Sequence, residues 1–139
     1  MSTRSLIGIL TENNQVKNIY CHSDGYIDGN GVILFDHYNS KRLVEEMIDR
    51  GSMSYLSERV DLCKYYGVKG ERDFESPQTY SLEKYASSAD GMIEYSYLFV
   101  PGEDRWYVAT CHEDELEGMT ESETYKGFYP LEDFFDEEQ

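Results

Sequence analysis

The chain has 139 residues, of which 40% are hydrophobic and 14% aromatic, so it is long and apolar enough to bury the core of one domain. Twenty-eight acidic residues against twelve basic ones give a formal net charge of −16, and a surface this negative repels nucleic acid and anionic membranes and attracts basic surfaces. No apolar run approaches the roughly 20 residues of a membrane-spanning helix, and the first ten residues lack the features of a signal peptide. We therefore expect a single domain, residues 1–139, in the cytoplasm.

The chain begins with the pattern of a β-hairpin. Residues 5–10, SLIGIL, form a short apolar run typical of a buried strand. Asn13 and Asn14 tolerate positive φ and mark a tight turn, after which residues 16–22 return as a second strand. Three glycines and two aspartates follow within residues 24–31, DGYIDGNG, and this composition predicts a loop.

The pattern then becomes helical. Residues 32–38, VILFDHY, have a short apolar face, and Asn39 or Ser40 can cap a second helix over residues 41–50. Gly51 follows at the position where a glycine commonly ends a helix. The apolar residues of the second helix recur as one buried stripe, Leu43, Val44, Met47 and Ile48.

The middle of the chain has weaker signals and ends in a second hairpin. Residues 55–66 are ambiguous between a helix and irregular chain, and Ser81 can cap a short helix. Residues 93–99 alternate with a period of two, and residues 105–111 return as their partner strand after a turn. Two hairpins with two or three helices predict an α+β fold, in which the helices cover one face of an antiparallel sheet.

The last segment, residues 112–139, carries most of the excess charge, with eleven acids and one base, Lys126. Aromatic residues are interleaved with the acids and predict that the segment is anchored to the core, with Pro130 as the first residue of a short helix. Carboxylates three or four residues apart on a helix lie about 6 Å apart, close to the phosphate spacing of a nucleic-acid strand. The acids expected to bind a partner are Glu113, Asp114, Glu115, Glu117, Glu121, Glu123, Glu132, Asp133, Asp136 and Glu137.

A second candidate site lies in the stretch IYCHSDGY. Cys21, His22 and Asp24 place a thiol, an imidazole and a carboxylate within four residues, and His37 completes the set. Neighbouring residues of a strand point to opposite faces, so Cys21 and His22 are poorly placed to act together as nucleophile and base. A structural role is therefore favoured over a catalytic one.

Metal-binding templates fit the chain poorly. A second Cys-His pair, residues 111–112, ends the other hairpin, but neither pair has the spacing of a zinc site. The DGYIDGNG loop does not place carboxylates where an EF-hand needs them, and its glycines indicate turns, with Asp28 or Asn30 capping the helix that starts at Val32. We expect no metal, no cofactor and no catalytic residue.

Several motifs of residues 1–56 resemble one family. MSTRSLIGIL, NIYCHSDGY, the following GNG, FDHYNSKRLVEEMIDRG and SMSYL are similar to small proteins encoded by bacteriophages, prophages and other mobile elements, and YLFVPGEDRWYV adds support. Members usually carry a tryptophan where this chain has Ser23. The family has no established enzymatic activity, so the resemblance implies a context, an infected host cell, and no catalytic residue.

Three functions follow as hypotheses. Small acidic proteins from phages are often inhibitors of host defence nucleases, of the anti-restriction or anti-CRISPR type, and some mimic DNA. The preferred hypothesis is thus a non-enzymatic protein whose acidic surface binds a basic host protein. We expect this surface to bind neither nucleic acid nor membrane. The alternatives are a small-ligand-binding protein or enzyme that uses the YCHSDGY loop, and an oligomerising structural module joined through a tyrosine patch. A surface kept acidic for solubility alone competes with all three.

Overall fold

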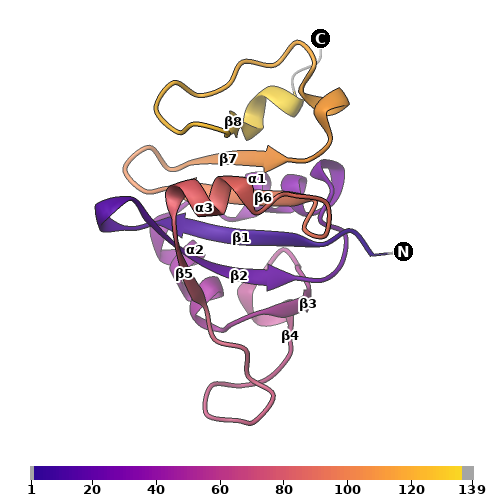
Figure 1. The fold of residues 1–139 in the computed structure, drawn as a ribbon. Helices are drawn as coiled ribbons and strands as arrows, with labels where there is room; N and C mark the ends of the chain where they lie inside the picture. Colours follow the sequence, from indigo (N-terminus) through magenta and orange to yellow (C-terminus); the bar gives the residue numbers. More distant parts are fainter. Residues whose placement is uncertain (1, 136–139) are drawn as a thin grey trace.

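A mixed β-sheet organises the chain (Figure 1). The computed structural model describes residues 2–135, and within them the sheet has eight strands in the order β4-β3-β2-β1-β6-β7-β8, with β5 pairing on β2. The strands are β1 Ser5–Leu10, β2 Gln15–Cys21, β3 Met53–Tyr55, β4 Lys64–Tyr65, β5 Gln78–Ser81, β6 Tyr95–Val100, β7 Arg105–Thr110 and β8 Tyr129–Pro130. The α-helices are α1 Val32–His37, α2 Lys41–Asp49 and α3 Leu82–Ser87. The short helical turns are η1 Glu12–Asn14, η2 Ile27–Gly31, η3 Val60–Leu62, η4 Glu113–Leu116 and η5 Leu131–Phe135.

Both predicted hairpins are confirmed, but the prediction of a purely antiparallel sheet is wrong. β1 pairs with β2 and β6 pairs with β7 in the antiparallel sense. The two hairpins join through β1 and β6, which are parallel, and β2 and β3 are parallel as well. The long connection between the hairpins supplies the crossover that parallel strands need. Every residue of β6 is buried, because this strand lies inside the sheet with both faces covered.

The helices lie on both faces of the sheet, so the prediction that they cover one face is wrong. Leu34 of α1 and the α2 stripe pack against Ile7 and Ile9 of β1 on one face. Tyr85 of α3 packs against Leu6 of β1 on the other face. In Figure 1, α3 passes in front of the sheet while α1 and α2 lie behind it. The fold therefore has two hydrophobic cores, one on each side of β1 and β6.

Local start and stop signals are confirmed in most places. The Ser40 hydroxyl accepts a hydrogen bond from the Leu43 N–H and caps α2, and Ser81 caps α3 in the same way. Asn13 has a φ of 62° in the β1–β2 turn. The prediction that Asp28 or Asn30 caps α1 is wrong, since Gly31 stands at that position and no side chain caps the helix. Within the predicted loop, residues 27–31 form the π-helical turn η2.

The acidic segment packs along β7 at the top of Figure 1. Phe128 and Leu131 are fully buried, and the Phe128 ring stacks on Tyr85 with centroids 6.0 Å apart. Pro130 ends β8, and the short helix η5 begins one residue later than predicted. No helix within residues 2–135 has both the length and the apolar character that crossing a membrane requires.

Candidate functional site

The negative charge is concentrated at one edge of the sheet. Residues 90–139 contain fifteen acids and two bases, Arg105 and Lys126, whereas residues 1–89 contain thirteen acids and ten bases. The described part of residues 90–139 forms β6, β7, β8 and the chain around them. We call the exposed carboxylates of this edge the acidic face, which comprises Glu103, Asp104, Glu113, Asp114, Glu115, Glu117, Glu121, Glu123 and Asp133.

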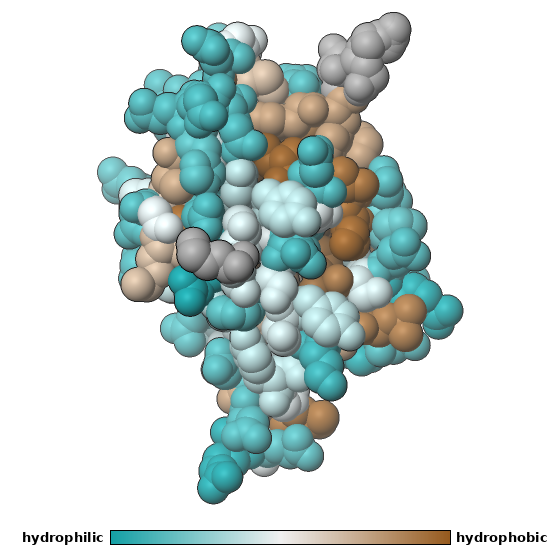
Figure 2. Space-filling model, turned by 90° about the vertical axis from the view of Figure 1, so that its right-hand side faces the viewer, coloured by the Kyte–Doolittle hydropathy of each residue, from teal (hydrophilic) through white to brown (hydrophobic). Residues whose placement is uncertain are grey.

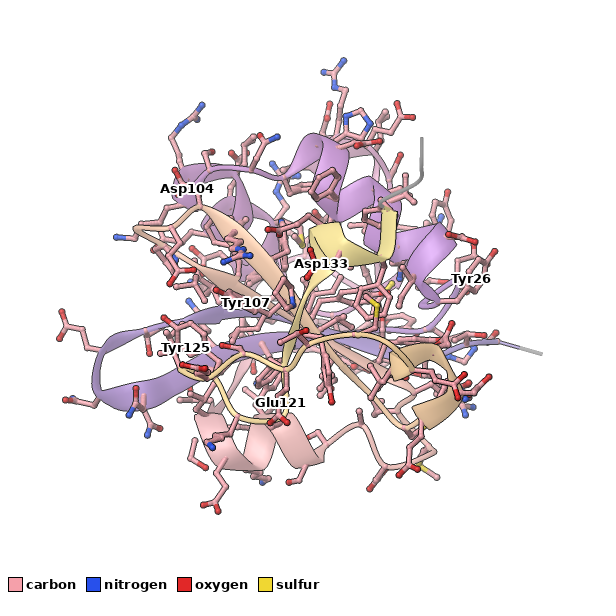
Figure 3. All side chains as sticks on the ribbon, turned by 90° about the horizontal axis from the view of Figure 1, so that it is seen from above. Tyr26, Asp104, Tyr107, Glu121, Tyr125 and Asp133 are labelled. Atoms are coloured by element: carbon pink, nitrogen blue, oxygen red, sulfur yellow. The ribbon has the colours of Figure 1, made fainter. Side chains whose placement is uncertain are left out.

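Seven of the ten predicted partner-binding acids are exposed on this face, and Glu132 is half-buried beside them. Asp136 and Glu137 lie outside the described residues. Figure 3 shows Asp104, Glu121 and Asp133 arranged around Tyr107 when the molecule is seen from above. The acidic face thus combines carboxylates from the β6–β7 turn, η4, the irregular chain after η4, and η5.

Three of the predicted acids already have partners inside the protein. Glu115 accepts a hydrogen bond from the Tyr95 hydroxyl at 2.5 Å. Glu121 accepts one from the backbone N–H of Gly127 at 2.6 Å. Glu132 pairs with the Arg105 guanidinium at 2.7 Å. Among residues 2–135, no hydrogen bond or ion pair engages the remaining carboxylates, those of Glu113, Asp114, Glu117, Glu123 and Asp133.

A hydrogen-bond network holds the face together at the end of the β6–β7 hairpin. Glu103 accepts from the Tyr107 hydroxyl at 2.6 Å and from the Tyr125 hydroxyl at 3.4 Å. Arg105 donates to Tyr107 and to Glu132, so it links β7 to η5. Burial and the bond to Glu103 raise the pKa of Tyr107 to about 12. The sequence predicted only a turn at Glu103 and Asp104, and their place on the face follows from the pairing of β8 with β7.

The acids do not form a regular helical array. The described part of the segment contains two short 3-10 helices, η4 and η5, separated by irregular chain and β8. Gly118 and Gly127 both adopt positive φ, which breaks any longer helix. The acids of the face are therefore distributed along this edge of the sheet without the even spacing that a helix would give.

The residues of the IYCHSDGY stretch are held apart. Cys21 is fully buried in one core, and burial raises the pKa of its thiol to about 11. The Nδ1 atom of His22 lies 2.7 Å from the Tyr20 hydroxyl. Asp24 and His37 are exposed, the latter at the end of α1. In the part of the chain that the structure describes, no hydrogen bond or ion pair joins any two of these four residues.

Instead, this stretch forms a tight corner joined to two other strands. The Asn30 side chain, almost fully buried, donates to the Ser5 hydroxyl at 3.3 Å and to the Ser23 carbonyl at 3.1 Å. The Tyr97 hydroxyl of β6 donates to the Gly25 carbonyl at 2.7 Å. A Cβ at Gly25 would lie 2.8 Å from the Thr3 carbonyl oxygen, so the corner requires a glycine. The stretch is a structural corner in this fold, and it presents Tyr26 to solvent.

The two Cys-His pairs lie on different strands. Cys21 ends β2 and Cys111 follows β7, with β1 and β6 between them. Three strand spacings separate the two by about 14 Å. His112 lies 2.8 Å from Glu94. Residues 2–135 contain no group of three or more histidine, cysteine or acidic residues that could hold a metal ion.

No family model matches the chain, and no curated protein or solved structure matches it.

Proposed function

We propose that the chain is a non-enzymatic accessory protein of a phage or mobile element that acts in the cytoplasm of the infected host. Its acidic face binds the basic, nucleic-acid-binding cleft of a host defence protein, of the restriction or CRISPR type. Occupation of that cleft excludes the nucleic acid and inhibits the defence protein.

The observation that supports this proposal is a set of unpaired carboxylates on a segment that packs against the core. Glu113, Glu117 and Glu123 lie on a segment whose Phe128 and Leu131 are fully buried. Like charges held close together destabilise a fold, and a flexible tail would let them separate. Holding them on packed chain favours a binding surface over a merely solubilising tail.

The surroundings of the face resemble the anatomy of a protein interface. In Figure 2, the upper part of the molecule divides into hydrophilic side chains on one side and hydrophobic ones on the other. Phe35 is 39% exposed, and the centroid of its ring lies 5.2 Å from that of Phe135 in η5. Aromatic contacts supply affinity at interfaces, whereas exposed charges set the association rate and the choice of partner.

Affinity capture from a bacterial lysate, followed by competition with duplex DNA, tests the proposal. We expect the captured proteins to be nucleic-acid-binding proteins that DNA displaces from the immobilised chain. Capture should be strong at about 50 mM salt and lost at about 500 mM, because exposed charges are screened. Captured proteins that DNA leaves in place would contradict the proposal.

Two variants with the same charge change separate the acidic face from overall charge. The face variant neutralises five carboxylates of the acidic face as amides, at Glu113, Asp114, Glu117, Glu123 and Asp133. The control variant neutralises five exposed acids elsewhere, at Glu12, Glu58, Asp73, Glu75 and Glu83. The face variant should lose capture and the control variant should keep it.

A further inference from the structure

A small pocket lies where η2, η4 and η5 meet. Its volume is about 340 Å³, and its lining consists of two aromatic rings, one aliphatic side chain and two carboxylates, from Tyr26, Phe134, Ile27, Asp28 and Glu115. None of these lining residues is basic. The volume is at the lower limit for ligand pockets, which run from about 300 to 1,000 Å³, and it suits one side chain better than a larger ligand.

Two tyrosines of β6 bond to the segments that supply Tyr26 and Glu115 to this pocket. The Tyr97 hydroxyl fixes the Gly25 carbonyl, next to Tyr26, at 2.7 Å. The Tyr95 hydroxyl fixes the Glu115 carboxylate at 2.5 Å, and the two tyrosine rings stack with centroids 6.3 Å apart. The backbone next to Tyr26 and the Glu115 carboxylate are thus both tied to β6, which reduces the ordering that a ligand must impose on them.

The lining selects a cation with an apolar stem. Aromatic faces attract an ammonium or guanidinium group, and carboxylates accept charge-assisted hydrogen bonds from it. The Ile27 side chain offers an apolar surface for the methylene stem of a lysine or arginine.

We propose that this pocket binds one cationic side chain of the partner, an arginine in the first place, between Tyr26 and Phe134 with its guanidinium on Asp28 and Glu115. Arginine fits better than lysine because its planar group stacks on rings and contacts carboxylates with two N–H groups. The inference deepens the proposed function, since a basic partner supplies such a side chain. It gives the DGY of IYCHSDGY a binding role through Tyr26.

An NMR titration of the ¹⁵N-labelled chain with Nα-acetyl-arginine amide tests the pocket without any partner. The matched probe is Nα-acetyl-citrulline amide, which has almost the same shape and no charge. We expect saturable shifts of the Tyr26, Asp28 and Glu115 amide signals with the arginine probe, at a Kd of about 1 to 10 mM for a single side chain. Equal shifts with citrulline would overturn the proposal.

Two double variants distinguish binding in the pocket from nonspecific attraction of the probe to the negative charge of the acidic face. Asp28→Asn with Glu115→Gln should weaken binding of the arginine probe by at least about ten-fold. Glu121→Gln with Asp133→Asn makes the same charge change outside the pocket and should change the Kd by less than about two-fold. Equal losses in the two pairs would overturn the pocket while leaving the acidic face in place. If the five-acid face variant still bound the partner, the proposed function would be wrong. The arginine pocket would be unaffected by that result, because the NMR titration uses no partner.

Discussion

Replacing Phe128 by alanine tests whether the acidic segment is part of the cooperative core. Phe128 is fully buried and stacks on Tyr85 of α3, and its backbone bonds to Ser122 and Tyr125. Truncating a buried phenylalanine to alanine costs about 3 to 5 kcal/mol of unfolding free energy, through lost burial and the cavity left behind. At about 3 °C per kcal/mol for a chain of this size, the Tm should fall by about 12 °C.

Urea unfolding followed by tryptophan fluorescence measures this loss. Trp106 is the single tryptophan and belongs to the core on the other face of the sheet, so it reports global unfolding. Met92→Ala is the control, because Met92 is 74% exposed and its truncation should change the free energy by less than about 0.5 kcal/mol. If Phe128→Ala only accelerates hydrogen exchange in residues 112–135 and leaves the Trp106 transition unchanged, the segment is not part of the cooperative core.

Three further predictions concern β1, β2 and the corner that follows them. Asn30→Ala leaves buried Ser5 and the Ser23 carbonyl without their donor and should cost about 2 kcal/mol in urea unfolding, whereas Asn39→Ala, at an exposed site, should cost almost nothing. A Cβ at Gly8 would lie 2.6 Å from Val16 and 2.9 Å from the Tyr85 ring, so Gly8→Ala should cost about 1 to 3 kcal/mol in thermal unfolding; an unchanged Tm would contradict this packing. Burial raises the pKa of Cys21 from 9.0 to about 11, so its contribution to stability is complete below pH 9 and is lost as the pH rises to 11. The loss should reach about 3 kcal/mol, and Cys21→Ala should flatten the unfolding free energy between pH 9 and 11 relative to the unsubstituted chain.

Local elements of this fold could be predicted because their signals lie close together in the sequence. The asparagines of the β1–β2 turn, the Ser40 cap and the glycine at 51 each act within a few residues. The parallel pairing of β1 with β6 joins residues about ninety positions apart, and no local pattern reports it. A signal does exist, since SLIGIL and YLFV are apolar at successive positions, which indicates strands buried on both faces. The same pattern requires covering helices on both sides.

The acidic segment could be predicted as a charged, aromatic-rich stretch, but not the state of each carboxylate. Glu115 and Glu132 are engaged by Tyr95 and Arg105, which the sheet brings to them from other parts of the chain. The pocket lined by Tyr26 also depends on tertiary structure, because its walls come from η2 with the residue before it, η4 and η5. Side-chain pairs between distant elements depend on the packed fold, so the spacing of residues in the sequence does not predict them.

Binding through the acidic face can be measured as the affinity for the captured partner at increasing salt, with the face and control variants side by side. We expect the Kd of the unsubstituted chain to weaken by at least about ten-fold between about 50 and 200 mM salt. The face variant should lose most of the affinity and the salt dependence, whereas the control variant should keep both. A Kd that is insensitive to salt, or equal losses in the two variants, would contradict binding through the acidic face.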